Sequence, residues 1–335
     1  MPVASEGTDR DLGTAPFRRR AQAAIGSPGR GLTGSATRGD RTLGAVAVLA
    51  ALLVPLILLG LAIQLWIGSA PTRATFGLSF LWRSQWNPVA GQYGALPFIF
   101  GTVVTGLISI VLATLAGMAI AVYLAEIVPV RLRGPLSFLV DLLAVVPSVV
   151  FGLWGIFVFI PWLRRTVELP LSEHFGGFFL FSGPPYGLGV LAAGILLAIM
   201  VTPTIVAITR EVLLAVPEEQ RNAALALGVT RWEMIRDIVV PAARTGIAGA
   251  VGLGLGRALG ETMAVTMVIG NTPQISTSLL ATGYSMPAVL ANEFTEASTT
   301  SHLSALMEIA LVLFFLTLVV NVGGRMLTQR REVAR

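Results

Sequence analysis

The sequence predicts an all-α, polytopic membrane protein with six transmembrane helices, and three observations carry that prediction. Of its 335 residues, 54% are hydrophobic and only 12% are charged, against about 25% charged residues in an ordinary soluble domain. Apolar runs recur along the chain and reach about twenty residues, the length that crosses a hydrocarbon core. The arginines gather in alternate connecting loops, as expected of a chain that crosses a membrane repeatedly. A soluble globular enzyme is therefore excluded.

The apolar runs define the predicted organisation of the chain. Residues 1–41 are rich in Gly, Ser, Thr and Arg without an apolar period, and we expect a disordered cytoplasmic tail. Residues 42–324 form the predicted six-helix membrane domain, and residues 325–335 a cytoplasmic C-terminal tail. The first run is too long for the apolar region of a signal peptide, so it is expected to be a retained helix. The predicted spans are 42–67, 95–123, 136–161, 188–208, 246–270 and 304–324.

The arginine distribution predicts the orientation in the membrane. The chain has no lysine and 23 arginines. Eighteen of these lie in the two ends and in the 124–135 and 209–245 loops, whereas four lie in the alternate, outer loops. By the positive-inside rule, both termini are predicted to be cytoplasmic. The positive charge therefore concerns orientation and contact with membrane lipid, and no nucleic-acid partner is expected.

Several kinds of chemistry are excluded by composition. Cysteine is absent, which rules out disulfides and thiolate metal sites. The two histidines, His174 and His302, are expected to be solvated loop residues, so neither a metal site nor a cofactor is predicted. The phosphate-binding loop (P-loop) of nucleoside triphosphatases needs a lysine, which this chain lacks. The sequence also offers no catalytic triad and no pair of catalytic carboxylates. The chain is therefore predicted not to be an enzyme and not to hydrolyse ATP itself.

The loop between the fourth and fifth spans is predicted to form a rigid helix–turn–helix knob in the cytoplasm. Pro217 and the two glutamates after it are typical of a helix start. Gly228 is a suitable C-terminal cap, and Thr230, with a glutamate three residues on, matches a capping box. Pro241 is predicted to end the second helix. The alternative is an amphipathic loop that rests on the lipid surface.

The fifth span contains two charged residues, Arg257 and Glu261, four positions apart. At that spacing they share a helix face and can pair. A lone charge at membrane depth costs between about 3 and more than 10 kcal/mol, so the pair is predicted to face a wet pathway. Arg257 would supply positive potential for an anion in transit, and Glu261 would keep that anion from being trapped. The alternative is a helix–helix ion pair without a role in transport.

Other carboxylates fall within or beside the predicted spans. Asp141 lies near the start of the third span and either faces a cavity or pairs with Arg131 or Arg133. Glu308 lies one turn inside the sixth span and is expected to extend to the outer interface. The outer segment 287–296 is predicted to form a short helix begun by its proline.

The cytoplasmic knob carries a spaced signature. Asn222-Ala223-Ala224, three residues, Gly228, nine residues and then Ile238-Val-Val-Pro241 resembles the coupling signature of ABC importer permeases. That signature reads Glu-Ala-Ala, three residues, Gly, nine residues and Ile-x-Leu-Pro. The chain departs from it at Asn222 and at Val240, which puts a salt bridge from the missing glutamate in doubt but not the shape of the knob.

Four further stretches resemble the PstC-type permeases of phosphate-specific ABC importers. They are the sequence around Arg257 and Glu261, the run from Asp141 to Gly155, the segment 288–297, and the start of the last span at 305–308. Together with the knob, they spread the resemblance over roughly residues 95–325.

This resemblance implies a type I ABC importer permease fold, a place in the bacterial plasma (inner) membrane and a set of partners. These are a second permease (PstA-like), two cytoplasmic ATPases (PstB-like) and an external phosphate-binding protein (PstS-like). The resulting site prediction assigns Arg257, Glu261 and Asp141 to the translocation pathway, Asn222, Ala223, Ala224, Gly228, Ile238 and Pro241 to ATPase coupling, and Glu293 and Glu296 to contact with the binding protein.

The predicted function is thus that of a permease subunit that forms half of the pathway of an ATP-driven phosphate importer and docks its ATPase through residues 217–241. One alternative is a permease for another oxyanion, such as sulfate or molybdate. Another is a stand-alone secondary transporter or channel, which would work without an ATPase.

Overall fold

The computed structural model describes residues 38–329 of the chain. The predicted disordered tail, residues 1–41, therefore lies outside the described residues except for its last four, which already belong to a helix. The chain divides into two compact units, Met1–Leu59 and Gly60–Arg335. The described part of the first unit is the beginning of helix α2, and all the other elements belong to the second.

All the regular elements in the described part of the chain are helices or helical turns. The β-structure among these residues is a single isolated antiparallel bridge between Asn87 and Gln92. The long and short helices in chain order are α2 (Arg38–Gly68), α3 (Ala70–Phe76), α4 (Leu96–Val122), α5 (Val130–Val145), α6 (Ser148–Trp154), α7 (Ile160–Leu163), α8 (Leu169–Phe175), α9 (Val190–Leu214), α10 (Glu218–Ala226), α11 (Arg231–Met234), α12 (Val240–Gly260), α13 (Met263–Val268), α14 (Met286–Glu293) and α15 (Thr300–Gln329). One 3₁₀ turn, η1 (Gly77–Leu81), and four wide π turns, η2 (Tyr123–Ile127), η3 (Gly155–Phe159), η4 (Arg164–Glu168) and η5 (Ile235–Val239), connect or extend them.

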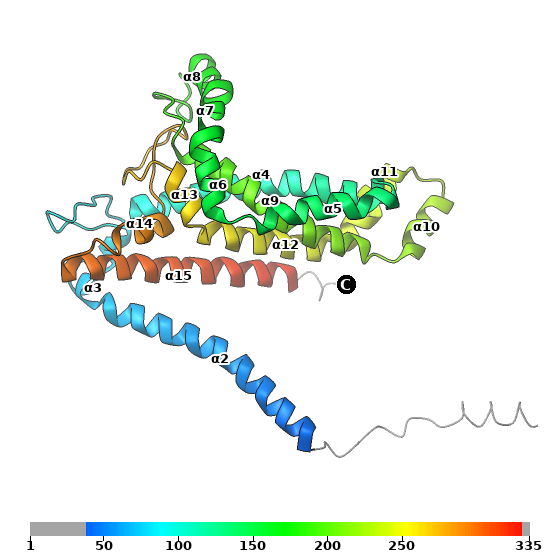
Figure 1. Ribbon diagram of the computed structural model, residues 1–335, viewed down its shortest axis with the longest axis horizontal. Helices are drawn as coiled ribbons and strands as arrows, with labels where there is room; N and C mark the ends of the chain where they lie inside the picture. The colour runs from blue at the N-terminus through cyan, green and yellow to red at the C-terminus, as the bar shows by residue number, and fades with distance from the viewer. Residues whose placement is uncertain (1–37, 330–335) are drawn as a thin grey trace, which may run out of the picture. The chain divides into compact units, whose positions relative to one another are not determined.

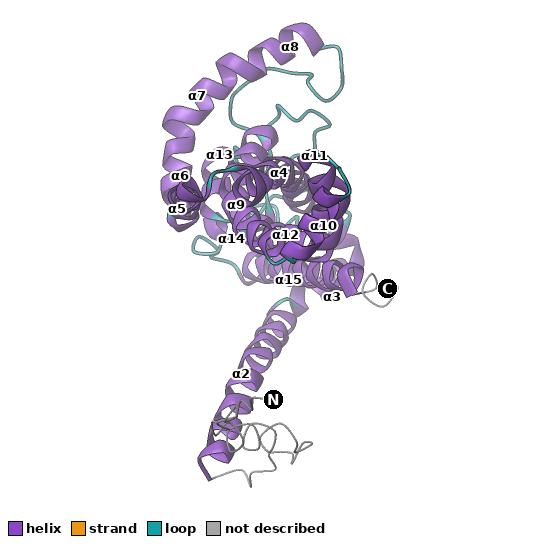
Figure 2. Ribbon diagram, turned by 90° about the vertical axis from the view of Figure 1, so that its right-hand side faces the viewer, coloured by secondary structure: helices purple, strands orange, loops and turns teal. Residues whose placement is uncertain are grey.

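The second unit is built around a bundle in which α4, α5, α9, α12 and α15 run alongside one another (Figure 1). Figure 2 views this bundle nearly end-on and shows α6, α7 and α8 curving away from it. The most extensive packing joins α4 to α9, and α12 packs against both. These three helices carry the centre of the fold.

Small residues allow the central helices to approach closely. Gly194 of α9 faces Ile108, and Gly254 of α12 faces Ile205, so a side chain at either glycine would meet its neighbour within 3 Å or little more. Gly101 of α4 lies against the main-chain carbonyl of Tyr284. In lipid, where apolar side chains gain little by leaving the solvent, such close packing holds helices together.

The prediction of six membrane spans is confirmed. Six described helices are long and apolar enough to cross a membrane: Thr42–Gly68, Leu96–Ile127, Ser148–Phe175, Val190–Leu214, Arg231–Gly260 and Thr300–Gly324. Four of them coincide with predicted spans to within a few residues, and the third and fifth differ in ways that have a clear cause.

The third span is not the single helix predicted for 136–161. The α5 helix ends at Val145, and Val146 and Pro147 are extended before α6 begins at Ser148. A proline disfavours the helical conformation at the residue before it, and Val146 is extended here. The candidate span consequently begins after this break and continues to Phe175.

The fifth span begins earlier and ends earlier than the predicted 246–270. The chain is helical without interruption from Arg231 through η5 and α12 to Gly260. The prediction that Pro241 ends the second cytoplasmic helix is therefore wrong. Pro241 lies in the first turn of α12, directly after the wide turn η5, where its missing N–H leaves no regular hydrogen bond broken.

The last helix also extends further than predicted. The α15 helix continues to Gln329, so the first five residues of the predicted C-terminal tail, 325–329, are helical. The remaining residues of that tail lie outside the described part of the chain.

A polar clip joins α3 to α15. The Arg73 guanidinium lies 3.5 Å from the Glu308 carboxylate, and the Thr72 hydroxyl donates to Ser304 Oγ at 2.8 Å. Only 8% of the surface of Glu308 is exposed. The prediction that Glu308 extends to the outer interface is thus wrong, because Arg73, from the segment directly after the first span, pairs with it inside the fold.

The two short predicted elements outside the spans are confirmed. Pro287 lies in the first turn of α14, and the Ser285 hydroxyl caps this helix by accepting from the Ala288 N–H. In the predicted helix–turn–helix knob, Gly228 takes a φ of 85° between α10 and α11, and Thr230 forms the expected capping box with Glu233.

Replacing Gly101 with valine should destabilise the fold, because the new side chain would collide with the Tyr284 main chain, which cannot move as a flexible side chain would. Overpacking of this kind costs about 1–3 kcal/mol. We expect a lower midpoint of thermal unfolding for the full-length protein in detergent.

The matched control is Gly249→Ala in α12, where no described atom outside the neighbouring turns of its own helix lies within 4 Å of the added carbon. This variant should unfold at or above the temperature of the unmodified protein. Equal midpoints for Gly101→Val and the unmodified protein would contradict the packing described at α4.

Candidate functional site

Arg257 stands on the exposed side of α12, near the end of the helix. Its Nη1 donates to the Thr204 hydroxyl of α9 at 2.9 Å. A guanidinium has five N–H donors and remains charged at any physiological pH. Because the hydroxyl partner is neutral, the full positive charge of Arg257 remains available at membrane depth.

The predicted ion pair between Arg257 and Glu261 is not formed. Among the described side chains the two groups lie beyond ion-pair distance. The reason is that α12 ends at Gly260 and Glu261 is extended, whereas pairing at a spacing of four needs a continuous helix. The Glu261 carboxylate instead lies 3.5 Å from the Ala264 N–H in the first turn of α13, where the helix dipole favours a negative charge.

Asp141 is exposed on α5 and makes no ion pair with either of its expected partners in the described part of the chain. Arg133 instead donates to the main-chain carbonyl of Ala125 at 2.7 Å. Large apolar side chains, Phe138 and Leu142, are exposed beside Asp141. A carboxylate in such surroundings is costly against lipid, so its place in a pathway stays a prediction.

The predicted coupling residues lie on and behind the cytoplasmic knob formed by α10 and α11. Asn222 and Ala223 are exposed on α10, whereas Ala224 is buried and anchors the helix. Gly228 forms the exposed turn. The remaining two predicted residues, Ile238 and Pro241, are half-buried where the knob joins α12.

The tip of the knob carries two large apolar side chains that face outward. Leu227 is 85% exposed and Trp232 is 65% exposed. Next to the buried Ala224, they give the knob an apolar contact surface of the kind found at the centre of protein interfaces.

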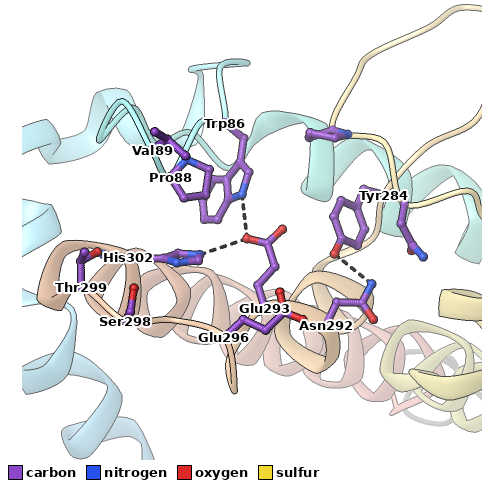
Figure 3. Close-up of a pocket in the computed structure, with 12 residues that line it drawn as sticks. Trp86, Pro88, Val89, Tyr284, Asn292, Glu293, Glu296, Ser298, Thr299 and His302 are labelled. Carbon is purple, nitrogen blue, oxygen red and sulfur yellow. Dashed lines mark hydrogen bonds and ion pairs between the residues drawn. The ribbon is translucent and has the colours of Figure 1, made fainter.

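An outer cavity of about 620 Å³ lies between the 83–94 loop, α14 and the start of α15. Figure 3 shows Trp86 and His302 both directed at the carboxylate of Glu293. The Trp86 indole donates to Glu293 Oε2 at 3.0 Å, and His302 Nε2 lies 3.0 Å from the same oxygen. Glu296, by contrast, is exposed at the edge of the cavity.

These contacts correct the expectation for His302. It is 8% exposed, stacks on Tyr93 with ring centroids 5.9 Å apart, and is not a solvated loop residue. His174 is exposed at the end of α8 as expected. Glu293 is committed to internal contacts, so of the two glutamates predicted to touch a binding protein only Glu296 presents a free carboxylate; that role stays a prediction for both.

Tyr284 borders the same cavity from the other side. Its hydroxyl accepts from the Asn292 amide at 3.0 Å, and burial raises the pKa of Tyr284 to about 12. The phenol therefore stays protonated, and the cavity presents a hydroxyl and two carboxylates at its wall.

Comparisons with known proteins agree with this architecture. The sequence profile of the family described as "Binding-protein-dependent transport system inner membrane component" matches residues 113–333. A phosphate transport system permease protein PstC from Mesorhizobium japonicum is 46% identical over 285 residues, covering 84% of this chain and 87% of that protein. A protein of the same name from Pasteurella multocida is 43% identical over 286 residues, with coverages of 84% and 89%.

Solved structures share the fold at low sequence identity. A chain of a bacterial alginate ABC transporter aligns with a TM-score of 0.55 and 15% identity, over 88% of this chain and 98% of that chain. A chain of the MetNI methionine ABC transporter, in an inward-facing conformation, aligns with a TM-score of 0.54 and 17% identity, over 73% and 99%. At such identities the likeness concerns the fold alone.

The fold and the matched profile define a class of multi-pass helical inner-membrane components of ABC transporters. The chain belongs to this family and, within it, to the PstC permeases. The predicted fold class and the predicted family are both confirmed.

Three residues that contact the predicted site residues Arg257 and Glu293 were not predicted from the sequence. Thr204 is one of several threonines in apolar runs, and nothing local distinguishes it as the partner of Arg257. Trp86 and His302 are far apart in the chain, and both contact Glu293 and lie edge to face with each other. The one available signal was the presence of a histidine and a glutamate nine positions apart in the last outer segment.

Replacing Glu293 with glutamine should loosen the outer cluster, because the amide carries no charge for its two donors. A hydrogen bond to a charged group contributes about 1.5–3 kcal/mol. We expect faster backbone hydrogen exchange in the 83–94 loop and in the first turn of α15, measured by mass spectrometry on the full-length protein.

Glu296→Gln is the control, since it makes the same chemical change on an exposed side chain of the same segment. It should leave exchange in the 83–94 loop unaltered. If both variants exchange like the unmodified protein, Glu293 does not hold this cluster together.

Proposed function

We propose that this chain is the permease subunit of an ATP-driven importer of inorganic phosphate and forms half of its translocation pathway. The observation that carries the proposal is the uncompensated charge of Arg257, exposed on a membrane-spanning helix in a chain whose relatives are named phosphate transport permeases. A cation on a membrane-spanning helix faces a water-filled path or its ligand, because lipid cannot solvate it.

The geometry suits weak, repeated contact with an oxyanion. One donor group of Arg257 is occupied by Thr204, and the remaining N–H groups can bind phosphate oxygens as charge-assisted hydrogen bonds. Conduction requires binding that is favourable but weak. The negative charge of Glu261, four residues along the chain, opposes tight retention of an anion without neutralising the guanidinium.

Coupling to ATP hydrolysis is proposed to run through the knob of residues 217–241. Its second helix is continuous with α12 up to Gly260, so a displacement of the knob moves the helix that carries Arg257. The exposed side chains of Leu227 and Trp232 provide the contact surface for a cytoplasmic ATPase. ATP binding and hydrolysis would reside in that partner.

The proposed assembly contains a second permease, two ATPase subunits and an external phosphate-binding protein. We expect both termini to be cytoplasmic, and the arginine distribution supports this orientation. This orientation puts the knob on the ATPase side and the cavity near Glu296 on the side of the binding protein. Asp141, exposed on α5, is proposed to line the pathway.

Replacing Arg257 with glutamine should remove the positive potential from the pathway. We expect phosphate uptake to fall by about 100-fold, the factor that corresponds to losing strong charge-assisted contacts. The measurement is uptake of labelled phosphate by cells that carry the variant in place of the native chain, together with recovery of the assembled complex.

Arg244→Gln removes an exposed arginine from the same helix, thirteen positions earlier, and should import phosphate at the native rate. Native uptake by an assembled Arg257→Gln transporter would contradict the proposed role of Arg257 in the pathway. Loss of sulfate or molybdate uptake with phosphate uptake unaffected would assign the chain to another oxyanion.

Replacing Gly228 with valine should separate ATP hydrolysis from transport. The φ of 85° at this turn costs a side-chain-bearing residue about 1–2 kcal/mol, and a β-branched side chain fits it worst. We expect binding-protein-stimulated ATP hydrolysis to be lost, or the ATPase to detach, in purified complexes.

Gly228→Asn is the matched variant, because asparagine tolerates the left-handed conformation, and its stimulated hydrolysis should be close to native. Native stimulation in Gly228→Val would count against the knob as the coupling element.

A further inference from the structure

Arg221 of α10 joins three parts of the cytoplasmic end of the protein. Its Nη2 donates to Glu126 Oε1 at 2.9 Å and to the Leu213 carbonyl at 2.7 Å, and its Nη1 donates to the Val216 carbonyl. The exposed fraction is 15% for the Arg221 side chain and 7% for that of Glu126. The sequence-based site prediction included neither of these residues.

The partners of Arg221 are the ends of two membrane helices. Leu213 lies in the last turn of α9, whose terminal carbonyls have no partner within the helix. Glu126 lies in the wide turn η2, which continues α4. A single guanidinium therefore binds α10 to both α4 and α9, the most extensively packed pair of helices in the bundle.

The α10 helix itself contributes little apolar packing. Of its nine residues, Ala224 is buried, Arg221 is half-buried and the other seven are exposed. Ala224 is its one member of the buried apolar cluster in which Met234 and Ile235 pack with Leu124 and Leu213. The ion pair therefore adds a directional polar contact between α10 and the end of α4 to this packing, beside a cavity of about 620 Å³.

We propose that the Arg221–Glu126 pair is a mechanical tie that transmits displacement of α10 to α4 and α9, and so to Thr204 and the pathway. The inference rests on the proposed function, since it concerns how ATPase movement reaches the membrane. The tie complements the continuous α11–α12 helix: one route moves Arg257, and the other moves the helix that carries its hydroxyl partner. Arg221 and Glu126 are positioning residues and do not touch the transported anion.

The deciding measurement is the number of phosphate ions imported per ATP hydrolysed, in proteoliposomes that contain the complete transporter and external binding protein. Glu126→Gln leaves Arg221 able to bind the α9 carbonyls but removes the charge pair. We expect this ratio to fall about fivefold, a typical size for a substitution that disrupts coupling, while the complex assembles and still hydrolyses ATP. Arg221→Gln should lower the ratio at least as far.

Two controls separate the tie from a general effect of charge. Glu211→Gln removes a carboxylate that is 74% exposed near the end of α9, and it should leave the ratio unaltered. Arg221→Lys keeps a cation and its donors and should retain most of the native ratio. In the double variant Glu126→Gln/Arg221→Gln, the loss should equal that of Arg221→Gln alone, because the tie can be broken only once.

A native ratio in assembled Glu126→Gln would overturn the tie, as would strictly additive losses in the double variant. Should Glu126→Gln fail to assemble, Glu126→Asp decides: it keeps the charge but shortens the side chain, and a native ratio there would also overturn the proposal. The Arg257→Gln measurement is independent. If that variant loses uptake while the tie variants keep the native ratio, the proposed function stands and only the tie is lost.

Discussion

The hydrocarbon core of a membrane offers no hydrogen-bond partner, and the whole structure depends on that constraint. Every long apolar segment is helical, because only a helix satisfies its own main chain in lipid. Threonines within the spans follow the same rule: Thr102 and Thr202 donate to carbonyls one turn earlier in their own helices. Two arginines within the fold are paired with carboxylates at the ends of the bundle, Arg73 with Glu308 at one end and Arg221 with Glu126 at the other.

Arg257 is the informative exception to this pairing. A carboxylate partner would have made the site nearly neutral, whereas Thr204 orients the guanidinium and leaves its charge in place. The break after Gly260 creates this difference, because it moves Glu261 off the face of α12 and gives it to the start of α13. A carboxylate near the cation but not bonded to it suits passage of an anion better than either a tight pair or a lone charge.

Helix continuity and helix breaks are distributed unevenly around Arg257. The α11 helix, η5 and α12 form one uninterrupted helix, whereas α10 is separated from it by the Gly228 turn. Beyond Arg257 the helix stops at Gly260, and the short α13 follows at once. A second break, at Pro147, separates α5 from α6, which packs against α13. Both breaks therefore lie on the side of Arg257 that is away from α10 and α11.

The sequence by itself determined what depends on neighbouring residues. The six apolar runs, the left-handed Gly228 turn, the Thr230 capping box and the proline at the start of α14 are local features, and the structure contains each of them. Tertiary structure decided every partner that comes from elsewhere in the chain. The sequence showed that Arg257 needs a partner but not that Thr204 supplies it, and it did not distinguish the buried His302 from the exposed His174. It also left open whether a proline bends, ends or merely begins a helix: Pro147 breaks one and Pro241 lies within another. The physical reason is that periodicity and capping act within a few residues, whereas the partner of a buried polar group is set by which helices pack together.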